Sequence, residues 1–208
     1  MQPHQVKDRT RFQSESFHFL LPEQALSCSY HRSGQTVRPR SDPVRLPYLL
    51  PSAGEFIVLE HTEHGTAVIA KDFVKRMEYG STGDYETSDV RSYCINDFYN
   101  EMVKSVGAEN IIRHTVDLTA DDGTGIKTVE GFVSILTTDR YRRYRKFLKA
   151  MGEAWWTATR VTAEVSGYTG SVCYVSSDGI LSWNDCYWSR GVRPVLTLSS
   201  STLVDTEE

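Results

Sequence analysis

The chain has 208 residues, a formal net charge of -4 at pH 7 and a pI near 5.9. This length suits one domain with an appendage or two small domains, and it excludes a large multi-domain machine. The mild acidity gives no overall attraction to nucleic acid or to an anionic membrane, so we expect no nucleic-acid partner.

The sequence shows no pattern typical of an export signal or of a membrane-spanning segment. No stretch reaches the roughly 18 apolar residues that a spanning helix needs, and residues 1–24 lack the apolar segment of a secretory signal. We therefore expect no membrane insertion. The expected location is the cytoplasm, or a larger particle such as a virion after assembly.

Residues 1–53 differ in composition from the rest of the chain. They hold six of the seven prolines, and seven basic residues against four acidic ones, so regular structure should be sparse there. We interpret residues 1–53 as a proline-rich, mildly basic arm and residues 54–208 as the folded domain. Such an arm suits attachment to a neighbour, either a second copy in a homo-oligomer or another partner; packing on its own domain is an equally good interpretation.

Regular structure is expected from Gly54 onward. Alternating apolar residues predict strands over 56–60 and 66–70, joined by a turn that contains Gly65. A helix should follow, with Thr87 or Ser88 as its N-cap and Gly107 at its end. The core-facing side of this helix is predicted to carry Val90, Tyr93, Cys94, Phe98 and Met102.

The second half of the chain predicts short strands and one more helix. Strand-like residues occupy 111–116 and 129–136, and a helix capped by Thr138 or Asp139 follows them. Its basic residues are interpreted as a solvated face, and its buried face should hold Tyr141, Tyr144, Leu148 and Met151. Further strands are expected at 154–160, 171–177, 180–185 and 192–198.

Local catalytic and metal-binding motifs are absent from the sequence. No stretch has the GxxxxGK[ST], GxGxxG or GxSxG pattern of phosphate-binding loops and serine nucleophiles. His61 and His64 fall in a predicted strand connection, which favours an exposed turn over a zinc site. Residues 117–125 are rich in Asp but lack the spacing and terminal Glu of an EF-hand, which favours a solvated loop. We therefore expect no catalytic residue, no metal site and no cofactor.

The four cysteines, Cys28, Cys94, Cys173 and Cys186, are scattered without a CxxC pair. This spacing excludes a zinc ribbon and a thioredoxin-like redox motif, and it favours free structural thiols. Cys173 and Cys186 flank a predicted hairpin and are the one pair that we would test for a disulfide.

The clearest local signal is a hairpin in which residues 172–175 and a strand from Ile180 flank a Ser-Ser-Asp-Gly turn. Its Asp-Gly pair suits positive φ, and alternate side chains along each strand should face opposite sides. Residues 183–191, WNDCYWSRG, then interrupt the apolar rhythm with large aromatic and short polar groups. Tyr and Trp with Ser, Asn and Asp form the mixture that antibody paratopes use, and indoles also stack on sugar rings.

Core packing is the competing interpretation of the tryptophans, because large aromatic side chains are mostly buried. We expect Trp155 and Trp156 to be core residues. We expect Trp183, Tyr187 and Trp188, interleaved with Asn184, Asp185 and Ser189, to form a recognition surface.

Five segments in order resemble an uncharacterised bacterial and phage domain family that ends in a GVRPxLxL strand. They are SDVRSYCINDFYN, VSILTTDRYRRY, AWWTATR, YVSSDGIL and GVRPVLTL, and the resemblance covers about Gly54 to Leu198. Two segments depart from the family pattern: Cys94-Ile95-Asn96 stands where Leu-Asn is usual, and residues 157–160 replace Leu-Arg-Ser-Pro.

The resemblance implies an α+β, C-type lectin-like mixed domain with short antiparallel strands and two helices. Its branch of that fold includes formylglycine-generating-enzyme-like domains, phage tropism determinants and the variable proteins of diversity-generating retroelements. In those relatives binding side chains lie just before and within the last hairpin. Here this implies ligand-binding roles for Arg160, Tyr168, Ser171, Tyr174, Ser176, Trp183, Asn184, Asp185, Tyr187, Trp188 and Ser189.

Two relatives suggest chemistry that we weigh against simple binding. The triplet Trp183-Asn184-Asp185 resembles the calcium-ligating triplet of true C-type lectins, but the chain has neither the EPN nor the QPD triplet that accompanies it. Formylglycine-generating enzymes use cysteines and copper. In this chain only Cys173 and Cys186 lie near the C-terminal hairpin, where the resemblance would place such a site.

The leading hypothesis is a non-enzymatic receptor-binding module of a phage particle or bacterial assembly. It would bind a bacterial surface protein or glycan through its C-terminal hairpin, which retroelement diversification could vary. The alternative is a structural virion or assembly protein whose hairpin contacts a fixed partner subunit.

Overall fold

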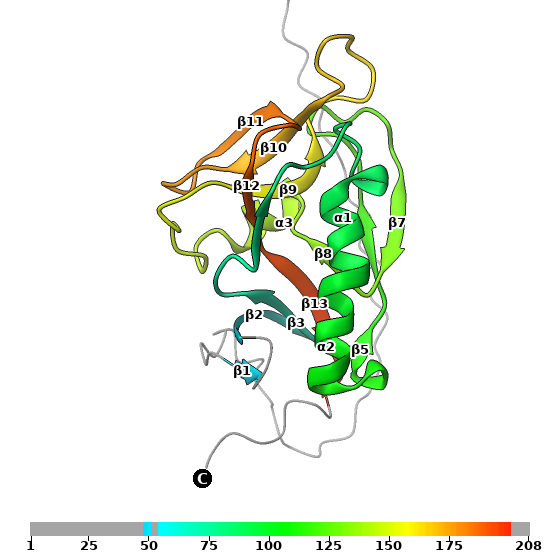
Figure 1. Cartoon of the computed structure of the whole chain (residues 1–208), viewed down its shortest axis with the longest axis vertical. Coiled ribbons are helices and arrows are strands. Elements are labelled where there is room, and N and C mark those ends of the chain that lie inside the picture. The colour runs from blue at the N-terminus through cyan, green and yellow to red at the C-terminus, as the bar shows by residue number, and fades with distance from the viewer. Residues whose placement is uncertain (1–47, 51–53, 201–208) are drawn as a thin grey trace, which may run out of the picture. The chain divides into compact units, whose positions relative to one another are not determined.

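The computed structural model describes residues 48–50 and 54–200, which form a mixed α+β unit (Figure 1). Its strands are short and mostly antiparallel, and they form two sheets and a two-stranded ribbon. The expected α+β class with short antiparallel strands is therefore confirmed. The predicted arm lies outside the described residues, except that Tyr48–Leu50 form strand β1.

The first sheet is organised around the C-terminal strand β13 (Pro194–Leu198). Its order is β1-β2-β3-β13-β5, and β8 also pairs with β13. The other strands are β2 (Gly54–Thr62), β3 (Gly65–Ala70), β5 (Ile111–Ile112) and β8 (Val133–Ile135). The predicted β2–β3 hairpin is confirmed, with exposed Glu63 and His64 as its turn and Gly65 as the first residue of β3.

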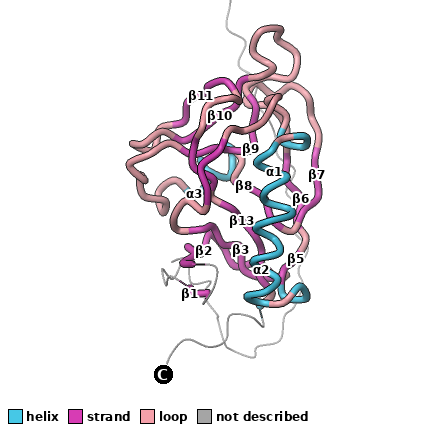
Figure 2. The backbone as a smooth tube through the Cα atoms, viewed as in Figure 1, coloured by secondary structure: helices cyan, strands magenta, loops and turns pink. Residues whose placement is uncertain are grey.

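The second sheet has the order β11-β10-β9-β12-β4 and carries the predicted C-terminal hairpin (Figure 2). Its pairs are antiparallel except for the parallel contact of β12 with β9. The small ribbon pairs β6 (His114–Asp117) with β7 (Thr128–Gly131). The strands of the second sheet are β4 (Lys75–Met77), β9 (Trp155–Arg160), β10 (Ser171–Val175), β11 (Leu181–Asp185) and β12 (Arg190–Val192).

The first predicted helix is confirmed as α1 (Asp89–Tyr93), a π-helical segment η2 (Cys94–Phe98) and α2 (Tyr99–Val106), which run as one coil in Figure 2. Ser88 caps it by accepting a hydrogen bond from the Arg91 N–H at 3.0 Å. Gly107 ends it at φ 84°, in the region that glycine adopts most easily. The short 3-10 turns η1 (Tyr85–Thr87) and η3 (Ala108–Asn110) flank it.

The second predicted helix is α3 (Thr138–Tyr144), and its expected N-cap was wrong by one residue. Thr137 is the cap, because its Oγ1 accepts the Arg140 N–H at 3.3 Å. The Thr138 hydroxyl donates instead to Asp121, which ties the start of the helix to the loop before β7.

Two hydrophobic clusters fill the interior, and one helix contributes to each. Val90, Cys94, Phe98 and Met102 of the long helix pack with Trp156 in the first cluster. Tyr141, Tyr144 and Leu148 of the α3 region pack with Trp155 in the second. The expectation that both tryptophans are core residues is confirmed, since each is at most 1% exposed. In the described part of the chain, no helix is both long and apolar enough to cross a membrane.

Candidate functional site

The hairpin of β10 and β11 forms one edge of the second sheet, with β11 outermost (Figure 1). Its register places Cys173 opposite Trp183 and Tyr174 opposite Ser182. Directly opposed residues of antiparallel strands project from the same face of a sheet. Trp183 therefore shares a face with Cys173, whereas Tyr174 lies on the other face.

The turn of this hairpin is held by Ser176 and by Gly179. The Ser176 hydroxyl donates to Asp178 and accepts the Ile180 N–H at 3.0 Å, so it is occupied by the turn itself. Gly179 takes φ 82°, and its carbonyl accepts the Tyr141 hydroxyl of α3 at 2.7 Å. The helix thus fixes the position of the turn.

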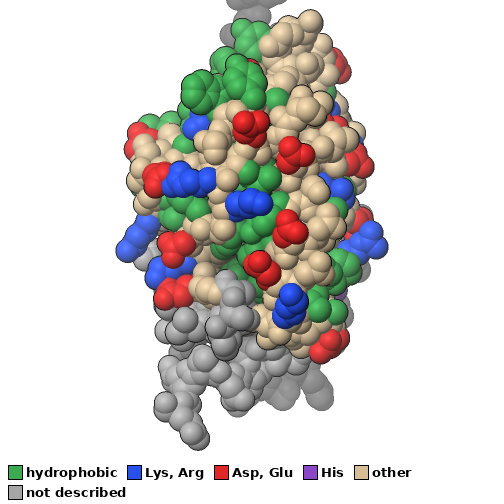
Figure 3. All heavy atoms as spheres, in the orientation of Figure 1, with side chains coloured by type: hydrophobic (Ala, Val, Ile, Leu, Met, Phe, Trp, Pro, Cys, Tyr) green, Lys and Arg blue, Asp and Glu red, His purple; other side chains and the backbone are tan. Residues whose placement is uncertain are grey.

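Four aromatic side chains at this end of the domain are exposed, and we call them the aromatic surface: Tyr168, Trp183, Tyr187 and Trp188. Their exposed fractions are 46%, 52%, 60% and 53% in that order. Tyr168 meets Trp183 edge to face with ring centroids 5.6 Å apart, and Tyr187 stacks on Trp188 at 6.4 Å. In Figure 3 hydrophobic side chains gather over β10 and β11.

Polar groups beside these rings are already ordered. The Tyr187 hydroxyl donates to Asp185 Oδ2 at 2.7 Å, which raises the pKa of Tyr187. Asn184 Oδ1 accepts the Asp185 N–H at 2.9 Å. That bond satisfies a backbone donor of the outermost strand, which protects the sheet edge from pairing with another strand. Ser189 is exposed in the same loop.

Tyr174 belongs to the opposite face and packs inward. The guanidinium of Arg190 lies 3.5 Å from the Tyr174 ring centroid and 5.2 Å from that of Trp156. Trp156 also meets Tyr174 edge to face at 6.4 Å. These contacts make Tyr174 part of an internal stack of rings and a cation.

Two more of the predicted binding residues are not exposed with the aromatic surface. Ser171 is buried, and its hydroxyl donates to Asp185 Oδ1 at 3.3 Å. Arg160 ends β9 and is half-buried, and its charge helps to lower the pKa of Asp84. The structure therefore brings together at the surface Tyr168, Trp183, Asn184, Asp185, Tyr187, Trp188 and Ser189. Ser171 is buried next to Asp185, whereas the side chains of Arg160, Tyr174 and Ser176 make their contacts elsewhere.

A shallow pocket of about 280 Å³ adjoins Trp183 and Tyr168. Sequence reasoning missed the residues that complete it, which are Asp122, Val161, Thr162 and Val165. Val165 and Ile180 are also more than half exposed. Lone apolar residues in segments rich in Ser, Gly and Glu would have been the signal.

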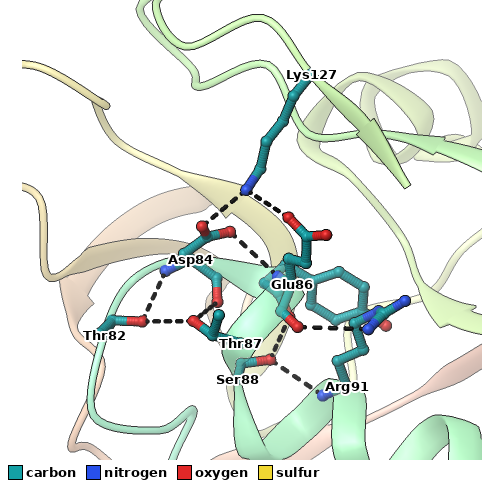
Figure 4. A network of polar contacts seen from close by, with 8 residues as sticks. Thr82, Asp84, Glu86, Thr87, Ser88, Arg91 and Lys127 are labelled. Atoms are coloured by element: carbon teal, nitrogen blue, oxygen red, sulfur yellow. Dashed lines mark hydrogen bonds and ion pairs between the residues drawn. The ribbon is translucent and has the colours of Figure 1, made fainter.

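The loop that carries Asp122 is anchored at its far end by Lys127 (Figure 4). Lys127 Nζ donates to Asp84 Oδ2 at 2.7 Å and to Glu86 Oε2 at 2.9 Å. Burial alone would raise the pKa of Asp84, but its hydrogen bonds from Lys127 and the Glu86 N–H outweigh burial and lower it. The pocket wall is thus tied to the turn before α1.

The cysteines near the hairpin are free thiols, and the disulfide considered from the sequence does not form. The register explains this, because Cys173 pairs with Trp183 while the Cys186 N–H bonds to the Gly170 carbonyl. Burial, together with the charge of Asp121, raises the pKa of Cys173 to about 12. Such a thiol holds little thiolate at neutral pH and is a poor nucleophile or metal ligand.

The Asp-rich loop between β6 and β7 directs its carboxylates to internal donors. Asp117 accepts the Thr119 hydroxyl at 2.6 Å, and Asp122 accepts the Thr124 hydroxyl at the same distance. Asp121 accepts Arg142 Nη2 at 2.9 Å. Across residues 54–200, no three His, Cys, Asp or Glu side chains converge as metal ligands would.

The aromatic surface combines exposed rings, ordered polar groups and a shallow pocket. Such an arrangement suits stacking of a ligand on the exposed rings. Compared with known proteins, the chain matches no family model, no curated protein and no solved structure.

Proposed function

We propose that this chain is a non-enzymatic ligand-binding module that recognises its ligand through the aromatic surface. We further propose a C-type lectin-like fold for residues 54–208, on a phage particle or bacterial assembly, with a surface protein or glycan as the ligand. The mixed α+β architecture and the late hairpin support that fold assignment.

One observation carries the proposal. Six of the eight exposed large hydrophobic side chains among the described residues lie between Val165 and Trp188. Exposed apolar groups scattered singly need no explanation, but a concentration of them marks an interaction site. The paired rings are also rigid anchors that lose little conformational entropy on binding.

Two features favour contact through side chains. The Asp185 N–H at the outer edge of β11 is already bonded to Asn184, so strand addition is hindered there. The rings of Trp183 and Tyr168 stand at right angles beside a pocket, with an interplanar angle of 80°. A sugar ring or an aromatic side chain of a partner would stack on one ring and contact the edge of the other.

The test is binding of labelled full-length protein to a panel of bacterial surfaces and glycans. The variant is the triple substitution Trp183→Ala, Tyr187→Ala and Trp188→Ala. The matched control is Ile126→Ala with Phe132→Ala, because both side chains are exposed but lie outside the hairpin. Thermal melting of each protein shows whether it is folded.

We expect binding by the wild type and the control, and loss of binding by the folded triple variant. Loss of wild-type binding in EDTA would show that a calcium ion takes part in recognition. Equal binding by all three proteins, or no binding to any surface, would overturn the proposal. It would instead favour a structural protein whose hairpin contacts a fixed subunit.

A further inference from the structure

A second pocket, of about 480 Å³, lies away from the aromatic surface and has no role in the function proposed above. Its apolar walls come from β2 and from the segment after α3, and include Phe56, Val58, Phe147 and Met151. Its volume is in the range of small-molecule sites, and such sites combine apolar walls with a few polar groups.

The polar groups of this pocket are mainly cationic. Lys71, Lys149 and Arg193 line it, with Asp72 as the one acidic lining residue. Lys71 is ion-paired with Glu55. Lys149 is exposed, and no hydrogen bond or ion pair links it to the described residues.

Arg193 is the unusual member, because it is only 1% exposed. Its Nε donates to the Ala70 carbonyl at 3.0 Å, and Nη2 donates to the Lys71 carbonyl at 3.2 Å. Its guanidinium also lies 5.1 Å from the Trp155 ring centroid. Nη1 is buried and has no hydrogen-bond partner among the described residues.

Arg193 is therefore held rigidly, but its Nη1 donor has no hydrogen-bond partner among the described residues. Two backbone carbonyls orient the fork. Asp72 of the same pocket attracts the guanidinium, but no carboxylate of residues 54–200 forms an ion pair with it. Burial lowers the pKa of Arg193 to about 10, so the group is still charged at neutral pH. A buried cation that lacks an ion pair is costly, and a guanidinium fork matches a carboxylate in shape and charge.

We infer that this pocket binds a small ligand with a carboxylate on an apolar stem. The carboxylate accepts a hydrogen bond from Arg193 Nη1. The positive charge of Lys149 also attracts it. The stem lies against Phe147, Met151 and the side chains of β2. The inference rests on the pocket alone and is independent of the aromatic surface.

The experiment is calorimetric titration of the full chain with three probes of equal chain length: octanoate, octanol and octylammonium. Octanoate should bind at least about tenfold more tightly than octanol, because only octanoate brings a negative charge to the guanidinium and forms a charge-assisted hydrogen bond. Octylammonium should not bind. Equal affinity for octanoate and octanol, or no octanoate binding at millimolar concentration, would overturn the inference.

Variants identify the site. Lys149→Glu should weaken octanoate binding several-fold, whereas Lys104→Glu, the same charge change on an exposed residue of α2 outside the pocket, should leave it unchanged. Arg193→Lys keeps the charge but loses the fork, and should also weaken octanoate binding. Unchanged affinity in Lys149→Glu and in a folded Arg193→Lys would place octanoate elsewhere and refute the assignment. The probe comparison still decides if Arg193→Lys fails to fold.

Discussion

Trp156 and Trp183 test how far exposure separates core from surface, because they are the same residue type in the same sheet. Trp156 is fully buried, and its Nε1 donates to the Met77 carbonyl at 3.1 Å. Trp183 is 52% exposed, with Tyr168 as its ring neighbour. Replacement of each by alanine should therefore have unequal effects on the free energy of unfolding.

The expected magnitudes follow from buried area. A fully buried tryptophan removes up to about 250 Å² from water, worth about 6 kcal/mol at ~25 cal/mol per Å². Residual structure in the unfolded chain reduces that figure, and core Trp→Ala changes typically lose about 3–5 kcal/mol. Trp183 keeps roughly half of its area in contact, so about 1–2 kcal/mol is expected after the same reduction. The difference between the two variants should be about 3 kcal/mol.

The assay is guanidinium unfolding followed by far-UV circular dichroism, since removing a tryptophan changes fluorescence itself. Both variants should keep the wild-type denaturant slope, so that the midpoint reports stability. If Trp156→Ala does not fold, the pair Trp156→Phe and Trp183→Phe makes the same comparison with smaller losses. Equal losses at the two positions would refute the view that Trp183 is a surface group.

Three further predictions concern the loop anchor, the thiols and one close backbone approach. Lys127→Met should destabilise by about 1 kcal/mol at pH 7, after discounting for solvent screening. The lowered pKa of Asp84 means that its stabilisation is complete above the ordinary Asp pKa and is lost as pH falls through the lowered value. Unfolding curves of both proteins should therefore converge in strong acid, and a constant difference would exclude the Lys127 network as the cause. Burial raises the pKa of Cys94 to about 12, so a thiol reagent should label it in the unfolded protein and not in the native one; rapid native labelling would contradict this. Gly65→Ala should lower the melting temperature strongly, because a Cβ there would lie 2.2 Å from the Leu198 carbonyl oxygen; an unchanged melting temperature would show that the strands can separate at no cost.

Much of the fold was predictable because its signals are local. The stripe from Val90 to Met102 and the Ser88 cap defined the long helix, and alternation defined most strands. The cap of α3 was missed because Thr137, Thr138 and Asp139 are all good caps, and only contacts with Asp121 distinguish them. When neighbouring residues are equally good caps, the sequence alone cannot show which of them the tertiary contacts select.

The candidate site was predictable as a region but not residue by residue. Composition alone drew attention to Trp183, Tyr187 and Trp188, and all three are exposed. Tyr174 has the same chemistry, but the pairing of β10 with β11 and the position of Arg190 turn it inward. The face that a strand residue occupies depends on register and on what packs against each face, which a single sequence does not contain.

The aromatic surface and the pocket at Arg193 should select ligands by different properties, so the two proposals can be tested separately. On the aromatic surface Asp185 and Asn184 already accept hydrogen bonds within the domain, so stacking and shape should contribute more to its specificity than charge does. Arg193 is the reverse case, because a charge is buried with one donor left open. A ligand there gains from an unpaired group that the fold itself leaves unsatisfied, so a missing charge on the ligand should reduce affinity more than a shortened stem. The same loss of charge on a ligand of the aromatic surface should matter much less.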